Sequence, residues 1–184
     1  SYPSPDYNSY TDLTISAPTG SVATNNLPCD AIPLTLGSIT SGNNACTNGS
    51  SEPSTPSCWT TGVLNTVWFT AVCPASGQLT IQTEIGTLTN TQIAVYSGTC
   101  SALTYVTGAC NDNITGCGSS DASRLTLTGL TPGATYYIRV DGAYDLIGGF
   151  TILAIDGTQS LPATLGQDCS AALPTCATSI NVGD

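Results

Sequence analysis

The sequence predicts an all-β protein, built as an antiparallel β-sandwich that is stapled by disulfides. Short runs of β-forming residues recur along the chain, and clusters of Gly, Pro, Asn and Ser separate them. No ten-residue window carries an apolar stripe of helical period. Nine cysteines among 184 residues are far more than ordinary usage. Short strands at this spacing are typical of a sandwich rather than of alternating helices and strands.

Nine strands are expected in chain order, and turn residues bound each of them. They cover residues 12–17, 31–36, 66–72, 78–84, 91–96, 103–107, 124–128, 135–141 and 150–155. Turns are expected at residues 73–77 (CPASG) and 130–133 (LTPG), because Pro fixes φ and Gly allows positive φ. In the fourth run, Leu79 and Ile81 alternate with Thr80, which predicts one apolar and one polar face.

The charge composition excludes several classes of function. The chain has 12 acidic residues, two arginines (Arg124 and Arg139), no Lys and no His, and its net charge is −10. Catalysis by a Ser-His-Asp triad, a Cys-His dyad or a Schiff-base lysine is therefore excluded, as are a His-bearing zinc site and a Walker lysine. Only Glu52 and Glu84 are glutamates, and they are weak candidates for a carboxylate pair. We therefore expect that the protein is not an enzyme.

Two classes of partner are also disfavoured. Nucleic acid requires a basic footprint, which this acidic chain lacks. Insertion into a membrane is not expected, because no apolar run approaches the roughly 18 residues that span a bilayer.

An internal repeat predicts a tandem array. The motif Cys-x-Ala at Cys29 returns 140 residues later at Cys169, and a strand with Thr-Ile precedes each copy. We therefore expect residues 1–26 to be the end of a preceding module with its linker, residues 27–157 a complete sandwich, and residues 158–184 a linker and the start of the next module. The lack of Met and the odd number of cysteines favour a piece of a longer chain.

The cysteines are expected to form disulfides rather than to bind metal, because the nearest neighbours are seven residues apart and not in C-x-x-C pairs. Disulfides persist in oxidising compartments, so the protein is expected to be secreted or on a cell surface. Local pairing predicts a Cys100–Cys110 bridge around a hairpin and a Cys46–Cys58 bridge around a loop. Spacing assigns no partner to the others: Cys29, Cys73, Cys117, Cys169 and Cys176.

The acidic loop from Asn111 to Asp121 suggests a calcium site, because hard cations take oxygen ligands. The candidate ligands are Glu52, Asn90, Asp112 and Asn113. An alternative of equal weight is a solvated turn whose Asn and Asp side chains bond their own backbone.

Several other side chains have two possible roles. Arg139 lies on the strand face opposite Ile138 and Val140, and it is expected to pair with a carboxylate rather than with a ligand. Asp141 is expected to accept hydrogen bonds from turn amides rather than to bind an ion. Trp68 and Tyr137 are expected in the core, which leaves Trp59, Tyr144 and Tyr105 as candidates for a sugar-stacking surface.

Several motifs together resemble one module type. They lie at residues 28–34 (PCDAIPL), 51–53 (SEP), 58–59 (CW), 65–69 (NTVWF), 73–77 (CPASG), 91–98 (TQIAVYSG), 110–113 (CNDN) and 136–142 (YYIRVDG). The run from Leu27 to Ile155 resembles the jelly-roll modules, similar to the bacterial pre-peptidase C-terminal domain, that recur in large surface proteins of Bacteroidota. The family commonly has two aspartates where this chain has Asp112 and Asn113.

The resemblance implies a jelly-roll-like sandwich, export across the outer membrane (often by type IX secretion), and a role as a stalk or adhesive repeat. We therefore expect a non-catalytic structural or adhesive repeat of a large secreted or cell-surface protein, forming a stalk, filament or adhesin. Its expected partners are neighbouring repeats, other copies in an oligomer or filament, and an unknown surface or glycan target. The alternative is a carbohydrate-binding module of a secreted enzyme that uses Trp59 and Tyr144.

Overall fold

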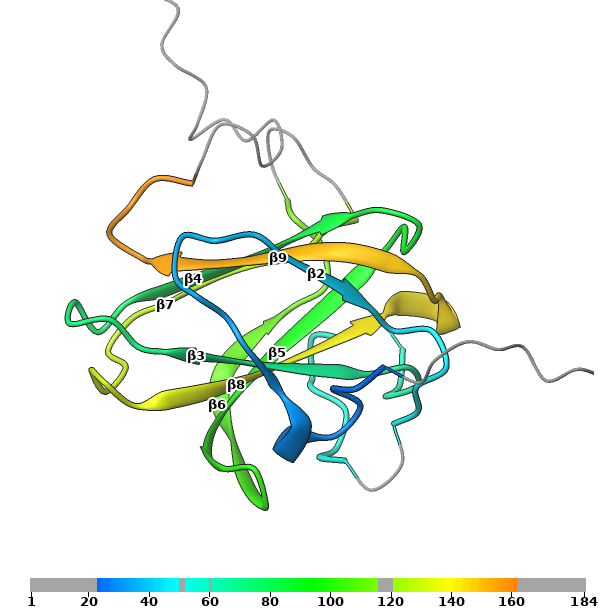
Figure 1. The fold of residues 1–184 in the computed structure, drawn as a ribbon, viewed down its shortest axis with the longest axis horizontal. Helices are drawn as coiled ribbons and strands as arrows, with labels where there is room; N and C mark the ends of the chain where they lie inside the picture. Colours follow the sequence, from blue (N-terminus) through cyan, green and yellow to red (C-terminus); the bar gives the residue numbers. More distant parts are fainter. Residues whose placement is uncertain (1–22, 50–51, 60, 116–120, 162–184) are drawn as a thin grey trace, which may run out of the picture.

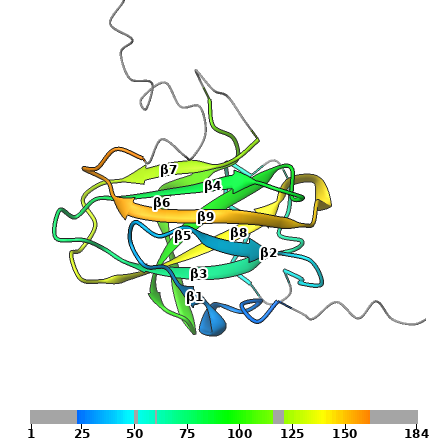
Figure 2. The same ribbon diagram turned by 45° about the horizontal axis from the view of Figure 1, so that its top comes forward.

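The computed structural model describes residues 23–49, 52–59, 61–115 and 121–161. Within these residues the chain forms two β-sheets packed face to face (Figures 1 and 2). The expected β-sandwich is thereby confirmed. The predicted strand at 12–17, the second copy of the repeat motif, and Cys117, Cys169 and Cys176 lie outside the described residues.

The first sheet has five strands, in the order β1-β3-β8-β5-β6. These strands are β1 (Ile32–Pro33), β3 (Val67–Val72), β8 (Thr135–Gly142), β5 (Thr91–Thr99) and β6 (Ala102–Asn111). The neighbours pair antiparallel, except that β1 runs parallel to β3. Two short 3₁₀ turns accompany this sheet, η1 (Pro28–Asp30) before β1 and η2 (Ala143–Asp145) after β8.

The second sheet has four antiparallel strands, in the order β2-β9-β4-β7. These are β2 (Thr40–Asn43), β9 (Gly149–Asp156), β4 (Leu79–Ile85) and β7 (Arg124–Leu127). Alternation holds here as predicted. Leu79, Ile81 and Leu127 are buried between the sheets, while the hydroxyl oxygens of Thr80 and Thr126 lie 2.9 Å apart across the strand pair.

Two features of the N-terminal region differ from the sequence-based expectation. The expected strand at 31–36 is a β-strand only over Ile32–Pro33, because the chain turns at Gly37 (φ +80°) and crosses to the second sheet. There the amide of Gly37 donates to the carbonyl of Ala154. Strand β2 is not predicted by the sequence because its residues, TSGN, have no apolar alternation. A Cβ at Gly42 would lie 2.5 Å from the ring of Phe150, so this strand passes against the ring where a side chain would not fit.

Apolar side chains from both sheets fill the space between them. The core includes Phe69 and Ile138 from the first sheet and Ile81 and Ile152 from the second, all at most 1% exposed. Phe69 and Phe150 meet edge to face, with ring centroids 6.1 Å apart. A separate apolar cluster lies on the outer face of the first sheet, around Trp59, Trp68 and Tyr96.

Across the described segments, no helix has the length and apolar character to cross a membrane.

Candidate functional site

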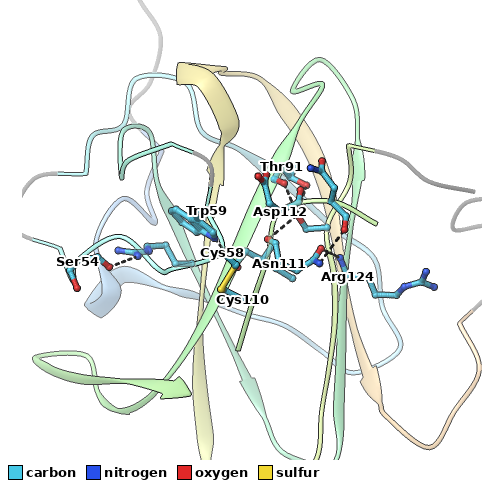
Figure 3. Close-up of a disulfide and its surroundings, with 12 residues drawn as sticks. Ser54, Cys58, Trp59, Thr91, Cys110, Asn111, Asp112 and Arg124 are labelled. Carbon is cyan, nitrogen blue, oxygen red and sulfur yellow. Dashed lines mark hydrogen bonds between the residues drawn. A yellow bond between two sulfur atoms is a disulfide. The ribbon is translucent and has the colours of Figure 1, made fainter. Parts of the chain in front are cut away.

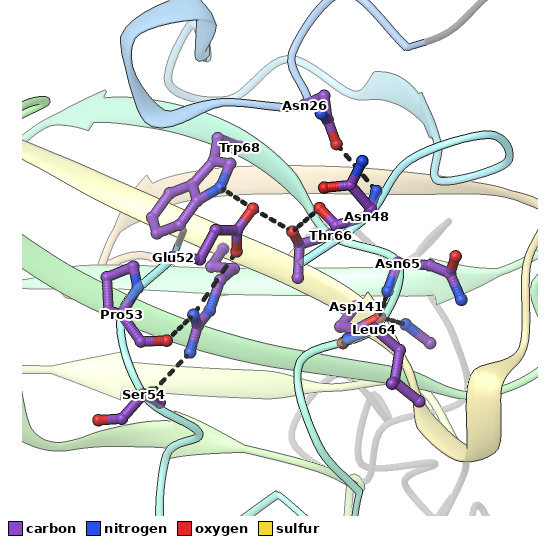
Figure 4. A network of polar contacts seen from close by, with 12 residues as sticks. Asn26, Asn48, Glu52, Pro53, Ser54, Leu64, Asn65, Thr66, Trp68 and Asp141 are labelled. Atoms are coloured by element: carbon purple, nitrogen blue, oxygen red, sulfur yellow. Dashed lines mark hydrogen bonds and ion pairs between the residues drawn. The ribbon is translucent and has the colours of Figure 1, made fainter. Parts of the chain in front are cut away.

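The site lies on the outer face of the first sheet, where four strands place one residue each in a row. The cross-strand pairs are Trp68 with Arg139, Arg139 with Ala94, and Ala94 with Cys110. A second row beside it pairs Tyr137 with Tyr96 and Tyr96 with Tyr105. Residues 52–59, which we call the covering loop, lie over these rows (Figure 4).

Arg139 is the centre of the cluster and is fully buried. Its guanidinium carbon lies 4.7 Å from the ring centroid of Trp59, 5.1 Å from that of Tyr96 and 5.6 Å from that of Trp68. A cation over aromatic faces is attracted by their quadrupoles. The guanidinium also donates to the carbonyls of Pro53 (2.7 Å) and Ser54 (3.1 Å) in the covering loop. The prediction that Arg139 faces away from Ile138 and Val140 is confirmed.

Glu52 supplies the counter-charge to Arg139. One carboxylate oxygen, Oε2, lies 3.6 Å from the guanidinium, and the side chain is 1% exposed. The other oxygen, Oε1, accepts hydrogen bonds from the hydroxyl of Thr66 and from the indole Nε1 of Trp68 (Figure 4). Burial raises the pKa of Glu52, although these two hydrogen bonds and the charge of Arg139 act in the opposite direction. Burial likewise lowers the pKa of Arg139.

Asp141 fixes the segment that leads from the covering loop into β3. Its carboxylate accepts from the amides of Leu64 (2.9 Å), Asn65 (3.0 Å) and Gly142 (2.8 Å). The side chain is fully buried, and burial raises its pKa while the three amides lower it. The expectation that Asp141 accepts from turn amides is confirmed.

Among the described residues two disulfides tie the first sheet together, and neither is a predicted pair. Cys29 is bonded to Cys100, and Cys58 is bonded to Cys110. The predicted Cys100–Cys110 bridge is wrong because the two residues stand near opposite ends of β6. Ten residues of strand span about 30 Å, whereas a disulfide needs Cα atoms roughly 4.4–6.8 Å apart.

The predicted Cys46–Cys58 bridge is also wrong. Cys58 is bonded to Cys110, the last residue of the first outward-facing row (Figure 3). This bond holds Trp59, the residue next to Cys58, against the sheet. The indole Nε1 of Trp59 donates to the carbonyl of Ile93 at 3.0 Å. Cys46 is an exposed free thiol, and Cys73 is a buried one.

The four residues predicted to bind calcium do not form one group. Glu52 is committed to Arg139, Thr66 and Trp68. The other three, Asn90, Asp112 and Asn113, lie where β5 begins and β6 ends. The hydroxyl of Ser123 joins these ends, because it lies 2.5 Å from the carbonyl oxygen of Thr91 and 3.2 Å from that of Asp112. No cluster of three or more His, Cys, Asp or Glu suited to a metal occurs among the described residues.

Oxygen atoms that could act as cation ligands nevertheless lie close together where β5 begins and β6 ends. The side-chain oxygen of Asn90 is buried and has no hydrogen-bond partner within the described structure. The carbonyl of Asn111 also faces Ser123, and the amide of Arg124 donates to the side chain of Asn111 (Figure 3). Carbonyl and amide oxygens suit a hard cation. Without Glu52, Asp112 is the only carboxylate of the predicted set here.

The predicted sugar-stacking surface of Trp59 and Tyr144 is not formed. Trp59 is 7% exposed, and both its ring face and its Nε1 are occupied by protein. Tyr144 is 64% exposed and lies in η2, in a left-handed conformation (φ 57°). Trp68 is buried as expected, whereas Tyr137 is only partly buried.

A pocket of about 490 Å³ opens beside the cluster, and the sequence does not predict it as a unit. Residues 53–57 form one wall, and Tyr96, Leu103 and Tyr105 form the other. The sequence singles out Tyr105 as a candidate surface aromatic, but its partner Tyr96 lies in an apolar run that is typical of core. The two tyrosines are direct cross-strand neighbours, and knowledge of that pairing would have placed them in one site. The pairing depends on a bulge between Ala94 and Tyr96, which the sequence does not reveal.

No protein-family model matches the chain, and no curated protein matches it in sequence. Among solved structures, it is similar to the 1.0 Å crystal structure of the pre-peptidase C-terminal domain of a collagenase from Bacillus anthracis, with a TM-score of 0.42 and 12% identity. That match covers 67% of this chain and 93% of the other. At this level of likeness it carries no argument about function.

Proposed function

We propose that this chain is a non-catalytic structural module of a secreted or cell-surface protein, in which tandem copies form a stalk, filament or adhesin. The buried charged groups support this role, because Arg139, Glu52 and Asp141 are all committed to internal contacts. The two disulfides favour an oxidising, extracellular compartment. The net charge of −10 favours solubility of a long array.

The ends of the described chain suit an in-line array. Near the N-terminal end, Asn25 pairs with Trp68 at the start of β3 through two hydrogen bonds of 2.8 Å. Near the C-terminal end, the amide of Gly157 donates to the carbonyl of Gln78, just past the turn that ends β3. The chain therefore enters and leaves at opposite ends of the sandwich (Figures 1 and 2). Successive modules joined this way would extend the array rather than fold it back.

The observation that carries the proposal is the placement of the Cys29–Cys100 bridge. Cys29 lies in η1, before β1, and Cys100 lies in the turn between β5 and β6, so the bridge brings these two segments together with their Cα atoms 4.8 Å apart. A pull on the two ends of the module passes from Cys29 through the bridge to Cys100. The chain between these two cysteines, which are 71 residues apart in sequence, cannot be pulled out to its full length while the bridge is intact. This shielded segment includes β3, β4, β5 and the covering loop.

The second bridge, Cys58–Cys110, limits extension of the chain only when the first bridge is broken. Cys58 lies inside the shielded segment and Cys110 lies outside it, 52 residues along the chain. While the Cys29–Cys100 bridge is intact, the shortest covalent path from Cys29 to Cys110 runs through that bridge and then along the chain from Cys100. The second bridge does not shorten this path, so it does not change the length to which the oxidised chain can be extended. Once the first bridge is lost, the load passes through Cys58–Cys110, which still shields 52 residues.

Stretching single molecules held at the two ends of the 184-residue chain tests this role. The measured quantity is the contour length released on unfolding. Reduction of both bridges is expected to release 71 more residues than the oxidised protein does, about 250 Å at roughly 3.5 Å per residue. Cys29→Ser with Cys100→Ser is expected to add only the difference between 71 and 52 residues, about 65 Å.

The matched control is Cys58→Ser with Cys110→Ser, which should leave the contour length of the oxidised protein unchanged. An oxidised protein that extends as far as the reduced one contradicts the load-shielding role, and with it the proposal of a mechanical module. Folded pairs of modules should also measure as extended, rather than compact, in solution scattering.

Calcium remains a proposal for the end of the strands that carries Asn90, Asp112 and Asn113, now without Glu52. Neighbouring repeats and other copies of the chain remain the proposed partners.

A further inference from the structure

The pocket beside the covering loop is a candidate binding site in addition to the structural role. Its volume of about 490 Å³ falls within the roughly 300–1,000 Å³ of small-molecule sites. One wall is the prolines and small polar residues of 53–57, and the other is the pair Tyr96 and Tyr105 with Leu103. The two tyrosine rings meet at an interplanar angle of 62°, with centroids 5.7 Å apart.

Both tyrosine hydroxyls of the pocket are buried and have no hydrogen-bond partner within the described structure. Tyr96 is 1% exposed, and burial raises its pKa to about 12. Burial also raises the pKa of Tyr105. The two phenols therefore stay protonated at neutral pH, so each can donate one hydrogen bond and accept another. A buried polar group without a partner is costly, and a ligand that supplies the partner recovers that cost.

The described lining residues of the pocket carry no charged side chain. Arg139 lies behind Tyr96, 5.1 Å from its ring, but Glu52 balances its charge at 3.6 Å. A charged ligand would lose its hydration here and find no counter-ion. The pocket therefore suits an uncharged molecule that carries both hydroxyl groups and an apolar face.

We propose that this pocket binds one ring of a neutral saccharide. The C–H face of the ring packs on Tyr105 and Leu103, and its hydroxyls exchange hydrogen bonds with the phenols of Tyr96 and Tyr105. The ring enters between residues 53–57 and the β5–β6 strands, where Tyr105 and Leu103 are only partly buried.

A peptide fits the same pocket less well. Extended peptides are held by main-chain hydrogen bonds along an open strand or loop. The nearby carbonyls of Pro53 and Ser54 are already occupied by Arg139, and the polar atoms left without partners are hydroxyls, not a row of amides.

Titration of the isotopically labelled full chain, followed by amide NMR shifts, tests this inference. The probes are the methyl glycosides of glucose, galactose, mannose and N-acetylglucosamine, with glucuronic acid as the charged comparison and a proline-rich peptide as the alternative class. At least one neutral glycoside is expected to shift the amides of Ser54, Thr55 and Ser57 and of residues 103–105 in a saturable way. Glucuronic acid is not expected to do so.

Tyr105→Phe removes one hydroxyl but keeps the ring, and it is expected to weaken binding about tenfold. Tyr144→Phe makes the same change at an exposed tyrosine of η2 and should leave the affinity unchanged. The inference is overturned if no neutral glycoside shifts these amides, if Tyr105→Phe binds as well as the wild type, or if only the peptide binds. Folding of each variant is read from the same spectra, and none of these outcomes bears on the contour lengths that test the structural role.

Discussion

The guanidinium of Arg139 lies 3.6 Å from the carboxylate of Glu52, and neither side chain is more than 1% exposed. The two charges come from β8 and from the covering loop, so their pairing attaches the loop to the sheet. Three aromatic rings and two loop carbonyls complete the surroundings of the cation. This outer face is therefore a second core, organised around a charge instead of an aliphatic side chain.

Arg139→Met is expected to reduce the free energy of unfolding by about 3–5 kcal/mol, because Glu52 would remain buried without its counter-charge. Adding Glu52→Gln to it should restore part of the loss, since the uncompensated charge is then removed. Urea unfolding of the oxidised protein measures both. Arg124→Met makes the same change in net charge at the other arginine and should reduce the free energy of unfolding by less. Equal reductions for the two variants would contradict the buried pairing of Arg139 with Glu52.

Stability is expected to rise when the pH falls from 7 towards about 4.5. The pKa of Glu52 is raised above 4.5 and that of Asp141 above 3.8, mainly by burial, so the folded protein binds these protons more tightly than the unfolded chain does. Their contribution is complete below the unfolded pKa values and is lost as the pH rises through the folded ones. Thermal unfolding between pH 7 and 4.5 measures the trend, and Glu52→Gln should flatten it.

Asp156 limits this trend in stronger acid. Hydrogen bonds from Thr158 and Ser76 lower its pKa, so its contribution is present above 3.8 and is lost as the pH falls through its lower, folded value. A melting temperature that falls steadily from pH 7 to 4.5 would contradict the raised pKa values of the two buried carboxyls.

Much of the sandwich could be predicted from its sequence, because runs rich in β-branched and aromatic residues are bounded by turn residues. The runs around Leu79, Ile93 and Ile138 were placed correctly for this reason, although most of their residues are buried on both faces of the strand. Strand β2 was not predicted because it is held by the neighbouring β9 and by the ring of Phe150, not by apolar side chains of its own. Local propensity does not contain that information.

The site was harder to predict, because it depends on which strands are neighbours. Arg139 and Asp141 were assigned correctly from strand alternation and from their position at a strand end. The disulfides were not, because Cys58 meets Cys110 only after β3, β8, β5 and β6 lie side by side. Sequence distance favours local pairs, whereas the register across four strands determines the real ones.

Removal of the Cys58–Cys110 bridge by two Ser substitutions is expected to cost about 4 kcal/mol, from the loop-closure entropy of 52 residues. Cys46→Ser is the matched control, because Cys46 is free and exposed, and it should leave the stability unchanged. Denaturant unfolding gives the two values. Peptide mapping without reductant should recover Cys29–Cys100 and Cys58–Cys110; recovery of a Cys46–Cys58 peptide would refute this assignment.

Gly142→Ala is expected to destabilise the protein by about 1–3 kcal/mol or more. A Cβ at this position would overlap the carbonyl oxygen of Leu146, which is main chain and has little freedom to move. Gly62→Ala is the control, because nothing lies within 4 Å of the position that its added methyl group would take, and its φ is not in the left-handed region. The difference in melting temperature between the two variants measures the effect.

Calcium binding at Asn90, Asp112 and Asn113 would make stability depend on the free ion. Calcium at 100 times its dissociation constant is expected to add about 2.7 kcal/mol to the protein after chelation. Asp112→Asn should reduce that gain, whereas Asp30→Asn, at the distant η1, should not. A melting temperature that is the same in EDTA and in calcium would remove this site from consideration.

The strand order also has a consequence for how the molecule reaches its native state. The last two strands in the chain, β8 and β9, are each interior strands: β8 separates β3 from β5, and β9 separates β2 from β4. A chain that emerges N-terminus first therefore cannot complete the first sheet before residue 142 is free, or the second sheet before residue 156 is free. Everything before that point exposes unpaired edges, which are prone to aggregation. Both sheets of the module are therefore complete only when all nine of the described strands are available.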